Sequence, residues 1–120
     1  MLDWVDSELL TFVERFASQR ALWKITEYFG RNPHISQTEE AIAQRLGLSI
    51  ADVGEPLQIL CRNGLLEREE TQGPPLYRLT SDPALHSMAR RFARLCDFAA
   101  RTSYQALLNP GNGHMAALNA

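Results

Sequence analysis

Two short helices joined by a tight glycine turn are predicted in the middle of this chain, and this pairing restricts the possible folds more than any other feature. Ser36 and Ser49 are each followed three residues later by a carboxylate, which is the pattern of a helix N-cap with a capping box. Gly47 ends the first helix, and Asn63-Gly64 supplies the C-cap of the second. The short connection between them predicts a helix-turn-helix.

Two further helices are predicted before this pair. Apolar residues at helical spacing indicate one helix from about residue 6 to residue 18, and a second stripe follows in a different phase. We expect a break near Ser18-Gln19-Arg20 between them. Gly30 and Asn32-Pro33 are expected to end the second helix, because proline cannot continue it.

A hairpin and a long helix are predicted after the pair. Residues 65–70 and 76–80 are strand candidates on either side of a Gly/Pro-rich turn, which favours a β-hairpin. Asp82 at the N-cap and Pro83 at the first helical position open a last helix, which ends at residue 109. The predicted fold class is mainly α with a small β-hairpin.

Composition restricts the class of protein. The chain has 120 residues, of which 45% are hydrophobic and 22% charged, as expected of one small globular domain. No run of 18 apolar residues occurs, and the acidic N-terminus does not have the pattern of a secretion signal. We therefore predict a cytoplasmic protein without a membrane-spanning segment.

Three segments in the central region combine a turn glycine, a helix end and strand residues in a recognisable order. They are Ile42-Ala43-Gln44-Arg45-Leu46-Gly47-Leu48-Ser49, Leu57-x-x-Leu60-x-x-x-Gly64-Leu65-Leu66-Glu67 and Tyr77-Arg78-Leu79-Thr80. Together they resemble bacterial MarR-like and ArsR-like transcriptional regulators. The resemblance covers about residues 20–80 and implies a winged helix-turn-helix there, to which the apolar stripes outside it add N- and C-terminal helices.

The resemblance and the apolar stripes on either side of it together divide the chain into four parts. Residues 1–19 form an N-terminal helix, residues 20–80 the winged helix-turn-helix, residues 81–109 a C-terminal amphipathic helix and residues 110–120 a tail. The resemblance also implies that double-stranded DNA is the partner, with the second helix of the pair in the major groove. The positions expected to face the groove are Ile50, Ala51, Asp52, Gly54, Glu55 and Gln58, and the DNA-binding candidates are Ser49, Ala51, Gln58, Arg62, Arg68 and Arg78.

The charge of this region supports a second interpretation. Residues 38–82 hold four basic and eight acidic residues, whereas affinity for DNA depends on cations that neutralise phosphates. A winged helix that binds a protein instead of DNA is therefore the alternative. Pro56 is also unusual inside a helix, and we expect either a kink or a helix that starts late, near Glu55-Pro56.

The terminal helices carry apolar stripes that predict a homodimer. The alternative is that both helices fold back on their own domain. On the outer face of the last helix, Arg94 and Asp97 are expected to form an ion pair. The residues assigned to dimerisation are Phe12, Phe16, Phe92, Leu95 and Ala99.

No catalytic or metal-binding pattern is present in the sequence. Cys61 and Cys96 lie on apolar faces and are expected to pack in the core. The three histidines have no Cys or carboxylate at ligand spacing, so no metal site is predicted. We therefore expect a protein that is not an enzyme and needs no cofactor.

Overall fold

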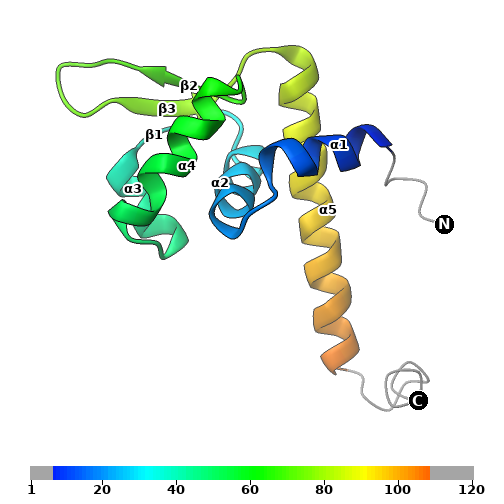
Figure 1. The fold of residues 1–120 in the computed structure, drawn as a ribbon. Coiled ribbons are helices and arrows are strands. Elements are labelled where there is room, and N and C mark those ends of the chain that lie inside the picture. The colour runs from blue at the N-terminus through cyan, green and yellow to red at the C-terminus, as the bar shows by residue number, and fades with distance from the viewer. Residues whose placement is uncertain (1–6, 109–120) are drawn as a thin grey trace.

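The computed structural model describes residues 7–108, with the side chains of residues 7–100, and contains five helices and a small sheet within that range (Figure 1). The order of elements matches the predicted one except for an additional strand. In chain order they are α1 (Ser7–Phe16), α2 (Arg20–Arg31), β1 (Ser36–Thr38), α3 (Glu39–Leu46), α4 (Ile50–Arg62), β2 (Leu66–Glu69), β3 (Leu76–Leu79) and α5 (Pro83–Leu108).

The helix-turn-helix forms as predicted at its turn. Gly47 has φ of 69°, a left-handed conformation that glycine adopts without strain, and it ends α3. Ser49 then caps α4, because its Oγ accepts a hydrogen bond from the backbone N–H of Asp52 at 3.1 Å. α4 begins directly after Ser49 and continues through Pro56, so the predicted late start is wrong.

The predicted capping role of Ser36 is also wrong. Ser36 lies in β1, in extended backbone opposite Arg78 of β3. The N-cap of α3 is Thr38, whose Oγ1 accepts a hydrogen bond from the backbone N–H of Ala41 at 3.1 Å. Both residues have side chains that can cap a helix, and the pairing of β1 with β3 decides which one does.

The sheet has three antiparallel strands in the order β1-β3-β2. β2 and β3 form the predicted hairpin, which projects from the helices as the wing in Figure 1. Because cross-strand partners share a face, the register places Arg68 and Tyr77 on one face and Glu67 and Arg78 on the other. This division decides which wing residues lie near α4.

The core joins the terminal helices to the central domain. Phe16 of α1, Phe29 of α2 and Phe92 of α5 are fully buried in one cluster with side chains of α3, α4 and the sheet. Residues 20–80 therefore share their core with α1 and with the first half of α5.

Gly30 lies inside α2 and does not cap it, contrary to the prediction. A Cβ at this position would lie 2.2 Å from the carbonyl oxygen of Ala89 in α5, so only glycine permits this close crossing. α2 ends at Arg31, and Asn32 forms its C-cap with φ of −125°.

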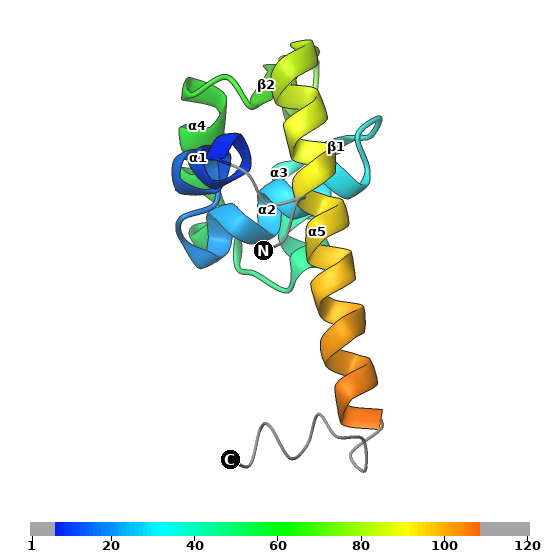
Figure 2. The same cartoon turned by 90° about the vertical axis from the view of Figure 1, so that its right-hand side faces the viewer.

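α5 is much longer than the surface that it covers. Its first half packs along α2, and its second half extends beyond the other helices (Figures 1 and 2). Asp82 caps its start as predicted, by accepting a hydrogen bond from the N–H of Leu85 at 3.0 Å. None of the helices in the described range is long and apolar enough to cross a membrane. The predicted tail, residues 110–120, lies outside that range.

Candidate nucleic-acid interface

α4 presents one stripe of exposed side chains to solvent. Its opposite face is held by Val53, Leu57 and Leu60, which are fully buried. Four of the exposed residues recur at helical spacing, so they lie in a line along the helix. They are Ala51, Glu55, Gln58 and Arg62.

The wing brings a further cation to the end of this stripe. A shallow pocket of about 250 Å³ lies between α4 and the hairpin, and it contains three of the predicted DNA-binding residues. It is lined by Gln58, Cys61, Arg62, Arg68 and Tyr77. An amide and two guanidinium groups can donate several hydrogen bonds into one place, which suits an anion such as a phosphate.

Arg78 lies apart from this pocket, although the sequence placed it in the same candidate site. Its guanidinium contacts Glu67 at 3.1 Å and Glu69 at 3.3 Å on the other face of the hairpin. The separation follows from the two-residue alternation of a strand, because Tyr77 already occupies the face toward α4.

Glu67 also fastens the base of the wing. Its carboxylate accepts hydrogen bonds from the backbone N–H of Ser81 at 3.2 Å and from the Thr80 hydroxyl at 3.4 Å. The hydrogen bond from Ser81 and the contact with Arg78 lower the pKa of Glu67. The wing is thereby connected to the segment that leads into α5.

Both wing arginines have acidic partners in the same chain. Arg68 contacts Glu70 at 2.8 Å, and the side chains of these ion pairs are between about one third and three quarters exposed. Exposed ion pairs are weak, about 0–1 kcal/mol, so a stronger anion can displace the carboxylates. The hairpin holds three glutamates and two arginines, so its formal net charge is −1 in the free chain.

The beginning of α4 contains the other predicted contacts. Ile50 and Ala51 are exposed, and Ser49 is exposed while its oxygen serves as the N-cap. Gly54 was expected to face outward, toward the groove, but it faces α3. A Cβ at this position would lie 3.1 Å from Oε2 of Glu39 in α3. Asp52 is exposed as predicted.

Three of the predicted dimer residues lie inside a single chain. The rings of Phe12 and Phe16 lie 4.9 Å apart between centres and are tilted by 47°, and the ring of Phe12 lies 5.9 Å from that of Phe92. Because all three rings are buried against their own chain, they do not face a second copy in this conformation. Leu95 is half-buried and Ala99 is exposed on α5.

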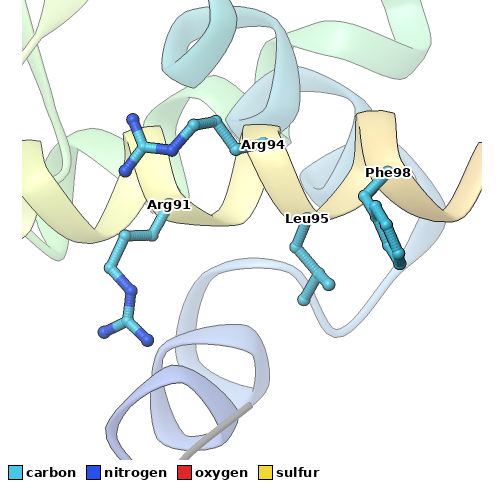
Figure 3. Close-up of a pocket in the computed structure, with 4 residues that line it drawn as sticks. All are labelled: Arg91, Arg94, Leu95 and Phe98. Carbon is cyan, nitrogen blue, oxygen red and sulfur yellow. The ribbon is translucent and has the colours of Figure 1, made fainter. Parts of the chain in front are cut away.

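Phe98 is an exposed aromatic residue that the sequence analysis did not select. It is 50% exposed and lines a hollow of about 360 Å³ with Arg91, Arg94 and Leu95 (Figure 3). Phe98 follows Leu95 by three residues and Arg91 by seven, and this helical spacing could have placed it on the same face of α5. Phe98 and the neighbouring Leu95 together make this part of α5 a candidate association surface.

Asp97 forms an ion pair with a residue of α2, and the predicted pair with Arg94 is absent among the described side chains. Its carboxylate contacts the guanidinium of Arg31, which also contacts Glu27 at 2.5 Å. This cluster joins α2 to α5 next to the close crossing at Gly30.

The cysteines and histidines form no obvious chemical centre in the part of the chain that is described. Cys61 and Cys96 are half-buried against the core, and burial raises the pKa of both thiols, that of Cys96 to about 12. The rings of His34 and His86 lie 6.3 Å apart. Among residues 7–100, no cluster of three or more His, Cys, Asp or Glu side chains could hold a metal ion.

The sequence was compared with known protein families and proteins, and the structure with solved structures; only the structural comparison gives matches. No family model and no curated protein matches the sequence. HlyU from Vibrio cholerae is similar in structure with a TM-score of 0.60 at 19% identity, over 74% of this chain and 92% of that one. The homodimeric winged helix-turn-helix DNA-binding domain of Mb0332 from Mycobacterium bovis, a possible ArsR-family regulator, has a TM-score of 0.53 at 20% identity, over 85% and 83%.

A third structure shows the same likeness. ZitR from Lactococcus lactis, in an apo form of a double mutant, has a TM-score of 0.53 at 20% identity, over 88% of this chain and 74% of that one. At these identities the likeness concerns the fold. The chain therefore has the winged helix-turn-helix fold, with α4 as the second helix of the pair and β2–β3 as the wing.

Proposed function

We propose that this protein is a homodimeric DNA-binding regulator of transcription. In this proposal residues 20–80 bind double-stranded DNA with α4 in the major groove, and the terminal helices, above all residues 81–109, join two copies. Ser49, Ala51 and Arg78 are additional candidate contacts outside the pocket beside α4. The Mb0332 domain, which has this fold, is described as homodimeric and DNA-binding.

The pocket between α4 and the wing carries the proposal. Gln58 and Arg62 from α4 and Arg68 from β2 converge there from two elements that are distant in sequence. A phosphate bound in the pocket would be held by two guanidinium groups and would displace Glu70 from Arg68. The same contacts would position the exposed stripe of α4 against base edges.

The shape of α5 is the evidence for the proposed dimer. Its second half overhangs the domain, and Leu95 and Phe98 line an apolar hollow on it (Figure 3). Burying such a surface against the equivalent surface of a second copy forms a two-fold interface. A dimer also doubles the number of arginines that meet one DNA duplex.

A protein-binding role is the second candidate, because the wing arginines are already paired. Arg68 and Arg78 contact carboxylates of their own hairpin, which therefore offers no net positive charge to DNA. In that case the exposed carboxylates of the wing and α4 would meet a partner with a basic surface.

Binding to a pool of random DNA duplexes at low salt tests the function. We expect the unmodified protein to bind the pool, and both Arg62→Ala and Arg68→Ala to weaken binding to all sequences to a similar extent. Arg90→Ala, an exposed arginine on α5, is the matched control and should bind normally. Absence of binding by the unmodified protein would favour the protein-binding role.

Sedimentation of two matched variants tests the dimer. Phe98 and Ile50 are exposed to the same extent, 50% and 51%, but Ile50 lies on α4. Phe98→Glu should yield monomers, because a charge would be buried in the interface, whereas Ile50→Glu should remain dimeric. A monomeric unmodified protein at micromolar concentration would refute the dimer.

A further inference from the structure

The carboxylates around the proposed interface fall into two groups. In the wing, Glu67, Glu69 and Glu70 each contact an arginine. Glu55 is exposed on the stripe of α4, and its carboxylate, like that of Asp52 at the start of the helix, has no hydrogen bond or ion pair with any residue in the described range 7–100. Its carboxylate is free to accept hydrogen bonds from a bound molecule.

The position of Glu55 determines what it would meet in DNA. It lies between Ala51 and Gln58 on the stripe, and the arginines of the pocket lie toward the C-terminal end of α4. If Arg62 and Arg68 hold the phosphate backbone, the middle of the stripe points into the groove. Glu55 would then face base edges.

The chemistry of a carboxylate selects among those edges. An ionised carboxylate only accepts hydrogen bonds, and the major groove offers two donors, the N4 amino group of cytosine and the N6 amino group of adenine. Adenine places the acceptor N7 beside its amino group, and this lone pair would repel the second carboxylate oxygen. Cytosine has no acceptor beside N4 at the major-groove edge, so it fits better.

We propose that Glu55 is a specificity-determining residue that accepts a hydrogen bond from N4 of a cytosine in each half of the DNA site. The inference rests on the proposed DNA-binding function. It assigns to the carboxylate in the middle of the α4 stripe the reading of a base, while the arginines of the pocket bind phosphate.

The spacing between Glu55 and Gln58 predicts where this cytosine lies in the DNA site. Gln58 follows Glu55 by three residues on the same stripe, a distance of about 4.5 Å along the helix axis. Base pairs are spaced about 3.4 Å apart, so the two side chains reach bases within about one or two steps. A glutamine pairs well with adenine, so we expect the cytosine next to, or one step removed from, an adenine.

Selection of binding sites from a random duplex pool tests the assignment. The unmodified protein, Glu55→Gln and Glu40→Gln are each used to select sites, which are then sequenced. Glu40 is exposed on α3, so Glu40→Gln makes the same change of charge away from the stripe. Glu55 is also exposed, and we expect both variants to fold normally, which circular dichroism checks.

We expect the unmodified protein and Glu40→Gln to prefer cytosine about tenfold at one position of each half-site. Glu55→Gln should lose this preference and favour adenine there, because an amide donates to N7 and accepts from N6. Unchanged base preferences in Glu55→Gln would overturn the role of Glu55 while leaving DNA binding intact. Failure of the unmodified protein to bind any duplex would overturn the proposed function, and this role with it.

Discussion

The close crossing of α2 and α5 at Gly30 allows a quantitative prediction for Gly30→Ala. The added Cβ would lie 2.2 Å from the backbone oxygen of Ala89 and 3.1 Å from Cβ of Ala93, so α5 must move away from α2. Overpacking costs about 1–3 kcal/mol, and a rigid backbone contact belongs at the upper end. Alanine recovers about 1 kcal/mol of helix propensity, which leaves a net loss of about 2 kcal/mol.

Urea unfolding followed by circular dichroism measures this loss. With a slope of about 2 kcal/mol per molar, the midpoint should fall by about 1 M. Gly54→Ala is the matched control, because its Cβ would meet only the flexible end of Glu39 at 3.1 Å. That variant should be as stable as the unmodified protein or more stable by up to about 1 kcal/mol. A Gly30→Ala protein of unchanged stability would refute the reasoning about the crossing.

Three further predictions concern caps and titrating groups. Ser49→Ala or Thr38→Ala should each lower the free energy of unfolding by about 1 kcal/mol, whereas Ser36→Ala should leave the denaturation midpoint unchanged; equal effects at all three would contradict the assigned caps. Because burial raises the pKa of Cys96 to about 12, peptide mapping after alkylation near pH 8 should show much slower modification in the folded protein than after unfolding, and equal rates would refute this. The pKa of Glu67 is lower in the folded state, so its contribution to stability is present above the unfolded-state pKa and is lost as pH falls through the folded-state pKa. Glu67→Gln should therefore make the free energy of unfolding less sensitive to acid below pH 4.5, the ordinary pKa. An unchanged acid sensitivity would contradict this role of Glu67.

The sequence predicts most helices of this fold because their signals are local. Gly47, Ser49 and Asp82 act through atoms within a few residues, so spacing alone locates them. β1 was missed because its pairing with β3 joins residues about forty positions apart. The misassigned cap at Ser36 has the same origin, since the capping-box spacing favours Ser36 over Thr38 and only the pairing with β3 shows that Ser36 lies in a strand.

The candidate site was only partly predictable for a related reason. An apolar stripe shows that Phe12 and Phe92 are buried, but not whether the partner is the same chain or a second copy. The sequence shows that the wing contains arginines, but not which face of the hairpin each arginine occupies. Strand register decides that Arg68 joins α4 and that Arg78 lies on the other face.

The salt dependence of DNA binding tests the central claim most directly. If Arg62 and Arg68 contact phosphate in each half of a dimer, about four contacts form, and the slope of log affinity against log salt should be about −3.6. Arg62→Ala should reduce the slope to about −1.8, while Arg90→Ala should leave it unchanged. Affinity that is absent, or a slope that Arg62→Ala does not change, would contradict a DNA-binding pocket between α4 and the wing.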